Sequence, residues 1–330
     1  MDETVKATPM AAVVIGRNEG ARLGPSLKSV QAAGLRAVYV DSGSADESPA
    51  LATKLEVPLV ELDFSRPFSA GRARNEGVRE ILRRWPETAY VVFLDGDCTL
   101  DAAFPTAAAA TLDEHANCAI VTGHLAERYP DASIYNRLCS IEWASPAGIV
   151  ETMSSLGGIM TIRVSAFQSV HGFNEQAIAG EEPDLGVRLG LAGYTMIKID
   201  RPMATHDAHM FSFRQWWIRA VRGGHALAHG YAEHREGRRE LLSALFWGLA
   251  LPAAILALIW PTRGFSLLLV AGYGIIGWRV YWHYLRSGRT PSDAWLVSRF
   301  NIYSRFAHMV GVLRYCANRL RGRFHIIEYK

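Results

Sequence analysis

The fold is most clearly indicated by one short stretch of the sequence, Tyr90-Val91-Val92-Phe93-Leu94-Asp95-Gly96-Asp97. Its first five residues form an apolar run with the length and composition of a buried β-strand. Two carboxylates separated by a single glycine follow where the strand ends. Oxygen ligands of this kind suit a hard divalent cation, Mg²⁺ or Mn²⁺, that also binds phosphates. The stretch therefore predicts a buried strand that leads into a cation and phosphate site.

The residues around this stretch alternate between short apolar runs and segments with helical spacing. Further strands are expected at Ala11–Ile15, Ala37–Val40 and Pro58–Leu62, and helices at Leu23–Ala33, Ala45–Leu55 and Ala70–Arg84. The second helix has Ser44 or Asp46 as its expected N-cap. This alternation is typical of an α/β fold with a mostly parallel sheet. Because ligands bind such sheets at the carboxyl ends of the strands, Asp41 and Asp95 become candidate site residues.

The bulk composition narrows the classes of protein that fit. A formal net charge of +3 over 330 residues is too small to suggest a nucleic-acid-binding protein. The four cysteines form no CxxC or Cys/His cluster, which fits a reducing cytosol. The first ten residues are polar and acidic rather than an apolar leader, so secretion is not expected. No G-x-G-x-x-G motif opens the first helix, which disfavours a dinucleotide-binding dehydrogenase.

Two long apolar runs follow residue 240. Leu241–Pro261 carries no charge and is interrupted only by Pro252, and Gly264–Trp278 extends to Leu285 if Arg279 snorkels. Basic residues precede and follow the pair: Arg235, Arg238 and Arg239, then Arg286 and Arg289. The positive-inside rule then places both ends in the cytosol and predicts a transmembrane hairpin. The alternative is a pair of core helices in a soluble protein.

The segment Ser292–Arg321 has a different pattern. Polar and basic residues recur there at helical spacing, namely Asn301, Arg305, His308, Gly311, Arg314, Asn318 and Arg321. A basic amphipathic helix after a hairpin suits the interface of an anionic lipid leaflet. A surface helix packed on the catalytic domain is the alternative. The predicted division is a catalytic domain at 1–232, a hairpin at 233–290 and the interfacial helix with its tail at 291–330, held at the inner membrane with the catalytic domain on the cytosolic side.

A series of motifs in the first two thirds of the chain resembles a known family. In order, the motifs are Arg17-Asn18-Glu19, Asp41-Ser42-Gly43-Ser44, Gly71-Arg72-Ala73-Arg74-Asn75, Asp95-Gly96-Asp97, Gly157-Gly158, Gly172-Phe173-Asn174-Glu175 and Gly180-Glu181-Glu182-Pro183-Asp184. The order resembles that of family 2 glycosyltransferases of the GT-A fold over roughly residues 10–225. Each motif is common by itself, but the ordered series is specific.

The resemblance implies roles for particular residues. Asp41 would accept a hydrogen bond from the nucleobase, and Glu19 would lie near the ribose. Arg17 and Asn18 would also bind the nucleotide sugar. Arg74 would help to fix the nucleotide, with Asn75 stabilising its loop. Asp97 would bind Mn²⁺ or Mg²⁺, and Asp95 would contact the ribose, the metal or a metal-bound water. His206, after the expected strand Tyr194–Ile199, would be a further metal ligand, with a structural role as the alternative.

The resemblance also implies the chemistry. Glu182 stands where the family usually has a catalytic aspartate, and because the usual Glu-Asp pair here reads Glu181-Glu182, the base is one of these two. Arg219 and Arg222 lie at i and i+3 of a helix, where they would clamp a diphosphate or else pair with Glu233 or Glu236. The processive-synthase motif Gln-x-x-Arg-Trp is not reproduced near these arginines.

The predicted function is inverting, metal-dependent transfer of a sugar from a nucleoside-diphosphate donor, UDP favoured, to a hydroxyl of a lipid-linked acceptor in the membrane. Two alternatives stay open at this point. One is a polyprenyl-phosphate glycosyltransferase, whose acceptor is a phosphate. The other is a membrane protein that binds nucleotide sugars without catalysis, since a fold does not guarantee a function.

Overall fold

The computed structural model describes residues 8–150, 157–177 and 179–322. The chain forms two compact units. The first, called the α/β unit here, comprises Met1–Arg128, Trp143–Ala177 and Glu181–Ala208. The second, called the helical unit, comprises Tyr129–Glu142, Ile178–Gly180 and His209–Lys330.

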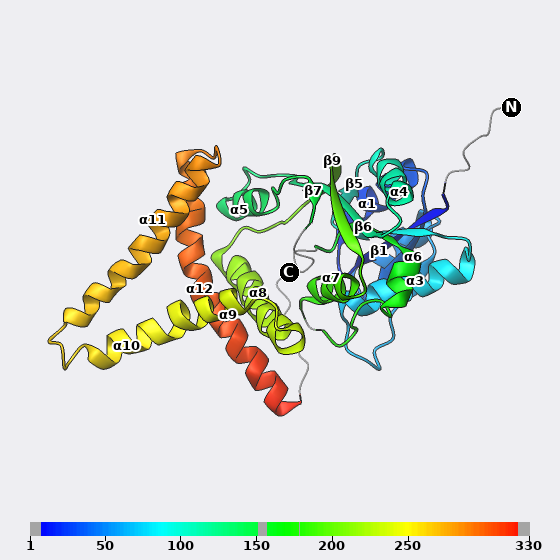
Figure 1. The fold of residues 1–330 in the computed structure, drawn as a ribbon. Coiled ribbons are helices and arrows are strands. Elements are labelled where there is room, and N and C mark those ends of the chain that lie inside the picture. The colour runs from blue at the N-terminus through cyan, green and yellow to red at the C-terminus, as the bar shows by residue number, and fades with distance from the viewer. Residues whose placement is uncertain (1–7, 151–156, 178, 323–330) are drawn as a thin grey trace. The chain divides into compact units, whose positions relative to one another are not determined.

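The α/β unit is built on one twisted sheet (Figure 1). Its strands are β1 (Met10–Gly16), β2 (Arg36–Asp41), β3 (Leu59–Glu61), β4 (Tyr90–Asp95), β5 (Cys98–Leu100), β6 (Cys118–Glu127), β7 (Gly148–Ile149), β8 (Met160–Arg163) and β9 (Thr195–His206). They lie in the order β3-β2-β1-β4-β8-β6-β9-β5, with β7 on β9. The pairs β3/β2, β2/β1, β1/β4 and β6/β9 are parallel and contain most of the paired residues, whereas β4/β8, β6/β8, β5/β9 and β7/β9 are antiparallel. The expected mostly parallel α/β sheet is therefore confirmed.

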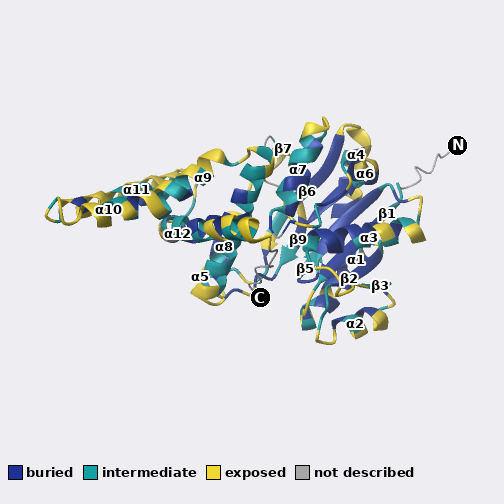
Figure 2. Ribbon diagram, turned by 90° about the horizontal axis from the view of Figure 1, so that it is seen from below, coloured by how far each residue is buried: buried dark blue, intermediate teal, exposed yellow. Residues whose placement is uncertain are grey.

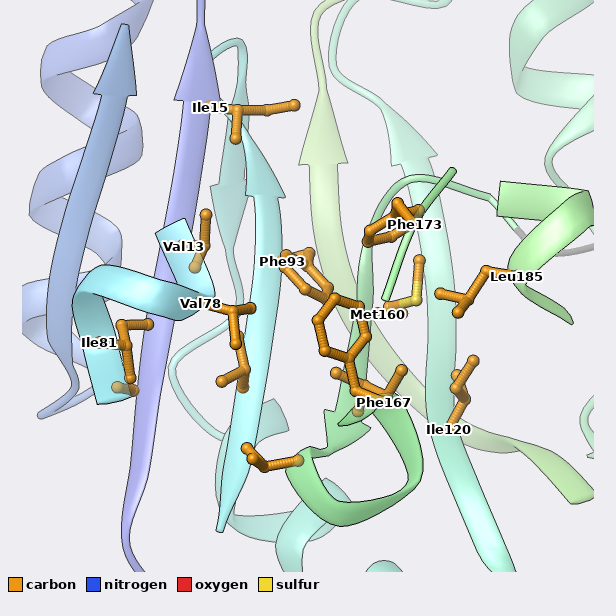
Figure 3. Close-up of a cluster of buried hydrophobic side chains, with 14 of the residues drawn as sticks. Val13, Ile15, Val78, Ile81, Phe93, Ile120, Met160, Phe167, Phe173 and Leu185 are labelled. Atoms are coloured by element: carbon orange, nitrogen blue, oxygen red, sulfur yellow. The ribbon is translucent and has the colours of Figure 1, made fainter. Parts of the chain in front are cut away.

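Helices cover both faces of this sheet. They are α1 (Leu23–Ala32), preceded by the 3₁₀ turn Gly20–Arg22, then α2 (Ser48–Lys54), α3 (Ala70–Arg84), α4 (Phe104–Glu114), α6 (Val164–Ser169) and α7 (Glu181–Leu191). Successive residues of β1 point to opposite faces, so Val13 and Ile15 join one core while Ala12 and Val14 join the other. The core under α3, α6 and α7 includes Phe93 and Phe167 (Figure 3).

The expected elements around the site are confirmed, with two differences: the strand expected at Tyr194–Ile199 continues to His206 as β9, and the second helix starts later than expected. It begins at Ser48 rather than Ala45, and neither Ser44 nor Asp46 is its N-cap. The side chain of Ser44 instead accepts the backbone N–H of Asn18 at 2.9 Å, and Asp46 accepts that of Gly20 at 2.9 Å. These polar side chains join two loops at the carboxyl ends of β1 and β2, and this holds residues 44–46 out of the helix.

The helical unit consists of α5 (Ile134–Glu142), α8 (Phe213–His234), α9 (Arg238–Leu245), the π-helical turn Phe246–Ala250, α10 (Leu251–Leu258), the 3₁₀ turn Phe265–Val270, α11 (Ala271–Arg286) and α12 (Pro291–Arg321). The π-helical turn lies just before Pro252. Proline has no N–H and its ring clashes with the carbonyl of residue i−4, here Gly248, so a wider turn lets the helix continue through it.

Two helical segments of this unit are long and apolar enough to cross a membrane, Arg238–Leu258 and Phe265–Arg286. Most of their side chains are exposed, as the largely yellow α10 and α11 of Figure 2 show. Leu256, Leu268 and Trp278 are 70%, 69% and 61% exposed. A helix in the core of a soluble protein is mostly buried, so this exposure disfavours the core-helix alternative.

Helices α8 and α12 cross in direct backbone contact. A Cβ on Gly224 of α8 would lie 2.2 Å from the carbonyl oxygen of His308, and one on Gly311 of α12 would lie 2.1 Å from that of Val221. Close crossings at small residues are typical of membrane-protein helices. The packing also differs from the predicted polar face of α12, because Gly311 of the expected polar stripe is buried and Arg305 and His308 are partly so, whereas the apolar Trp295 and Leu313 are exposed. The tail after Gly322 lies outside the described residues.

Candidate active site

A buried arginine joins three elements at the carboxyl edge of the sheet. Arg74 projects from α3 and is only 2% exposed. Its Nη2 lies 3.1 Å from Oδ1 of Asp95 at the end of β4, and its Nη1 lies 2.8 Å from Oε1 of Glu182 at the start of α7. Oε1 of Glu181 is 4.0 Å from the same Nη1. We call Arg74 with these three carboxylates the Arg74 junction. It places a candidate nucleotide-binding residue and both candidate bases at one point.

The electrostatics of the junction favour the charged form of Arg74. Burial alone lowers the pKa of the guanidinium, but the carboxylates of Glu182, Asp95 and Glu181 outweigh this and hold its pKa above the ordinary value. The ring of Phe173 lies 5.4 Å from the guanidinium carbon. An arginine that is both buried and paired is a rigid element, because removing one partner leaves an uncompensated buried charge.

Gly158 is required by this arrangement. A Cβ on it would lie 2.5 Å from Nη2 of Arg74 and 3.2 Å from carboxylate oxygens of Asp95 and Glu182. For Gly157, the first glycine of the motif, no atom of the described residues lies within 4 Å of the position a Cβ would take. Thus the sequence motif marks a close approach of the backbone to the junction at its second glycine only.

The two candidate bases differ in access. Both occupy the first turn of α7, where the helix dipole stabilises carboxylates. The side chain of Glu182 is 18% exposed and that of Glu181 is 7% exposed. Because a general base must reach a hydroxyl of the acceptor, Glu182 is better placed than Glu181 for that role.

A second cluster lies at the ends of β5 and β9. Asp97, Cys98 and His206 present ligand atoms that all lie within 4.8 Å of one another, and Oδ1 of Asp97 is 3.3 Å from Nε2 of His206. In the described part of the chain, the buried Nδ1 of His206 has no hydrogen-bond partner. The carboxylate and the imidazole fit Mn²⁺, with phosphate and water oxygens completing its shell, while the softer Cys98 thiol is an atypical ligand for it.

The two acidic residues of the Asp95-Gly96-Asp97 stretch are therefore separated. Asp97 belongs to this cluster, and its carbonyl accepts the backbone N–H of Asp207 at 3.3 Å. Asp95 faces Arg74 and is not among the clustered ligands. Trp143, which the sequence does not single out, packs edge-to-face on the ring of His206 with centroids 4.7 Å apart.

The predicted nucleoside-binding residues gather where β1 and β2 end. Asp41 is 2% exposed, and its carboxylate accepts hydrogen bonds from the Tyr39 hydroxyl at 2.9 Å and from the Ser44 N–H and hydroxyl at 2.7 and 2.6 Å. Burial raises the pKa of Tyr39 and the Asp41 carboxylate raises it further, so the tyrosine stays protonated and donates. Much of the hydrogen-bonding capacity of Asp41 is thus used to hold the turn that follows β2.

Asn18 and Glu19 are positioned by their backbone. Asn18 has a left-handed φ of 54°, and its Oδ1 accepts the N–H of Ala45 at 2.8 Å. Glu19 is buried beside two glycines, because a Cβ on Gly16 or on Gly96 would lie 2.9 Å from its Cγ. Arg22 lies 3.0 Å from Oε2 of Glu19.

Asn75 has a structural environment, as expected for a residue that stabilises a loop. Its Nδ2 donates to the carbonyl of Phe173 at 2.9 Å, and its Oδ1 accepts the N–H of Phe173 at 2.9 Å. The side chain therefore fixes α3 against the loop that carries Phe173.

Arg219 and Arg222 lie on α8 of the helical unit. Arg219 Nη1 is 2.7 Å from Oε2 of Glu142, a partner different from the Glu233 or Glu236 suggested by sequence spacing. Arg222 is partly buried near His225. A diphosphate clamp formed by these two arginines stays a prediction.

Comparison with known proteins agrees with this geometry. The family model described as glycosyl transferase family 2 matches residues 12–169. A solved structure of the mannosyltransferase PcManGT from Pyrobaculum calidifontis, in complex with GDP-Man and Mn²⁺, is similar with a TM-score of 0.63 and 17% identity, covering 96% of this chain and 89% of that one. S. aureus TarS 1–349 in complex with UDP-GlcNAc is similar with a TM-score of 0.50 and 15% identity, covering 96% and 92%. Among curated proteins, no sequence matches this chain.

The α/β unit therefore has the GT-A fold, and the protein is a glycosyltransferase. More particularly, residues 12–169 are the part of the chain that matches the model of glycosyl transferase family 2. At identities of 15–17% the structural likeness establishes the fold alone.

Proposed function

We propose that this protein transfers a sugar, with inversion, from a nucleoside-diphosphate sugar to a hydroxyl of a lipid-linked acceptor at the cytosolic leaflet of the inner membrane. UDP-sugars and GDP-sugars are the donors to test first, because the similar structures hold UDP-GlcNAc and GDP-Man. The observation that carries the proposal is the Arg74 junction, which sets a candidate base beside the carboxyl end of β4.

Glu182 is proposed as the base. Arg74 holds its Oε1, so we assign the proton of the acceptor hydroxyl to Oε2. The acceptor oxygen forms a bond to the anomeric carbon while the bond from that carbon to the diphosphate breaks on the opposite side. One displacement of this kind inverts the configuration, and the nucleoside diphosphate leaves with the bonding electron pair.

Asp97 and His206 would hold the divalent cation, Mn²⁺ or Mg²⁺. When bound, such a cation offsets the negative charge that develops on a leaving diphosphate. Asp95 would meet the ribose or a water of the cation from its place on Arg74. Asp41, Asn18, Glu19 and Arg17 would form the nucleoside side of the site.

The membrane part of the proposal is supported by the helical unit. The two apolar segments expose most of their side chains, which would be unfavourable in water and suits lipid. Arginines before Leu241 and after Leu285 would keep both ends in the cytosol. A catalytic domain attached to that leaflet would reach acceptors that are themselves lipids.

The proposed function is tested by screening sugar nucleotides with extracted membrane lipids as acceptors and Mn²⁺ or Mg²⁺ present. Transfer of label into the lipid fraction, with an inverted linkage, is the expected result. A product whose sugar is attached to a polyprenyl phosphate would instead support the phosphate-acceptor alternative. Donor binding without transfer or hydrolysis for any donor would support the non-catalytic alternative.

Membrane attachment is tested separately by fractionation. The full-length protein should remain with membranes through high-salt and carbonate washes and require detergent for release, because the apolar segments would be embedded in lipid. A chain ending near Glu240 should be soluble and still bind the donor, but it should lose transfer to lipid. Release of the full-length protein by salt alone would show that the hairpin only touches the membrane surface.

A further inference from the structure

Two phenylalanines in the loop between β3 and α3 form an aromatic pair on the surface of the α/β unit. The rings of Phe64 and Phe68 pack edge-to-face with centroids 5.2 Å apart. The side chain of Phe64 is 81% exposed. A single exposed aromatic residue is ordinary in a flexible loop, so the meaning of this pair depends on how its loop is held.

The loop is anchored from inside. Arg72, 2% exposed, donates to the carbonyls of Asp63 at 3.1 Å and Arg66 at 2.9 Å, and its Nη2 lies 2.8 Å from Oδ2 of Asp63. At the end of the loop, the hydroxyl of Ser69 donates to the carbonyl of Glu175 at 2.9 Å. Because these bonds fix the backbone on both sides of Phe64, its exposed position is a property of the fold.

The pair also touches the predicted nucleoside site. A Cβ on Gly43, in the turn held by Asp41, would lie 3.0 Å from Phe68 and 3.2 Å from Phe64. Gly43 has a φ of +77°, which favours glycine. The guanidinium carbon of Arg17 lies 5.7 Å from the centroid of the Phe68 ring. Loops after β1, β2 and β3 thus meet at the edge where parallel sheets bind ligands.

We propose that Phe64 and Phe68 form a stacking surface for the nucleobase of the sugar-nucleotide donor. This inference rests on the proposed function, and it adds the basis of base recognition. Every nucleobase has a flat aromatic face, so stacking tolerates different bases. Since Asp41 already accepts three hydrogen bonds from Tyr39 and Ser44, stacking carries much of the base contact. The site therefore accepts both uridine and guanosine diphosphates, and its affinities for the two differ modestly.

The test uses the full-length protein in detergent with Mn²⁺. Dissociation constants are measured calorimetrically for UDP, GDP and inorganic pyrophosphate, which lacks a base. Phe64→Ala should weaken UDP and GDP binding roughly 5- to 150-fold, the range found when a base loses an aromatic partner. Pyrophosphate binding should not change, and Phe64→Tyr should bind both nucleotides nearly as well as the wild type.

Leu191 provides a matched control, because it is also 81% exposed and lies at the end of α7. Leu191→Ala should bind all three ligands like the wild type. Equal weakening of pyrophosphate and nucleotides in Phe64→Ala would overturn the inference, as would unchanged binding of both nucleotides. In both cases the proposed function would stand, whereas failure of the wild type to bind any nucleoside diphosphate would overturn the two together.

Discussion

The two units of this protein differ in which side chains they bury and which they expose. In the α/β unit the apolar runs Ala11–Ile15 and Tyr90–Leu94 are buried, and the buried Arg74 meets two carboxylates within 3.1 Å. In the helical unit large apolar side chains such as Leu256 and Trp278 are exposed, while His225 is 3% exposed and neither of its ring nitrogens has a hydrogen-bond partner in the described residues.

This difference fits the surroundings proposed for each unit. The α/β unit has the interior of a water-soluble enzyme, in which buried charge is placed only where partners hold it. The helical unit combines small-residue crossings with an apolar exterior, as proteins in lipid do. Variants that disturb one pattern should leave the other unit intact, and this gives four tests in order of expected effect.

The largest effect is expected for Asp97→Asn. Asp97 lies in the Asp97–Cys98–His206 cluster, and an amide is a much weaker cation ligand than a carboxylate. Transfer should fall to background, while the thermal unfolding midpoint stays close to that of the wild type. Wild-type rates that persist in excess chelator would contradict a metal-dependent site.

The next effect concerns the two adjacent glutamates. Glu182→Gln should lower the transfer rate by roughly two to four powers of ten, the contribution typical of a general base. Donor binding should change little, because the base acts on the acceptor. Glu181→Gln is the matched variant, and a greater loss of rate in it than in Glu182→Gln would assign the base to Glu181.

A smaller, purely structural effect is expected at the crossing of α8 and α12. Gly224→Ala would bring a Cβ to 2.2 Å from the His308 carbonyl oxygen. Forcing the helices apart should destabilise the helical unit by about 1–3 kcal/mol, the usual cost of overpacking. A Cβ from Gly230→Ala on the same helix would meet no atom of the described part of the chain within 4 Å, so this variant should be neutral or stabilising. Thermal unfolding in detergent compares them, and equal midpoints would refute the close crossing.

The smallest effect is a pH dependence of the same unit. Burial lowers the pKa of His225 and that of His308 to about 4. The charges of His229 and Arg222 lower the pKa of His225 further. Arg305 lowers the pKa of His308 further, and Glu142 raises it. Both histidines are therefore neutral when folded, and the unfolded chain binds their protons more readily. Stability should be complete above pH 6.5 and decline as the pH falls toward 4. His225→Phe should make the midpoint of thermal unfolding depend less on pH over this range. An unchanged pH dependence would show that His225 does not contribute to it.

Much of the fold could be predicted because hydrophobic periodicity is a local property. Helix α3 has the expected bounds Ala70–Arg84, and strands β1, β2 and β4 extend the expected runs by one or two residues. The second helix and the polar face of α12 were less accurate. In both cases side chains are bound by residues distant in sequence, such as Asn18 for Ser44 and Ser243 for Arg305.

The candidate site was predicted as a set of residues, but its pairings were not. Arg74 and Glu182 are 108 positions apart, and Trp143 precedes His206 by a long segment. Neither local spacing nor composition indicates such contacts. Cys98 directly follows Asp97, and Tyr39 lies two residues before Asp41, but neither was singled out, because the sequence does not show that their side chains turn toward the site.

By itself the sequence determined the alternation of strands and helices, the acidic residues at the strand ends and the two apolar segments, because each depends on neighbouring residues and on burial. Only the tertiary structure decided that Asp95 faces Arg74 while Asp97 joins His206. Asp95 is still in register with Ile15 on β1, whereas Asp97 lies beyond the strand and is held to β9 through Asp207. Two residues apart in the chain, they are directed to different partners by different strands.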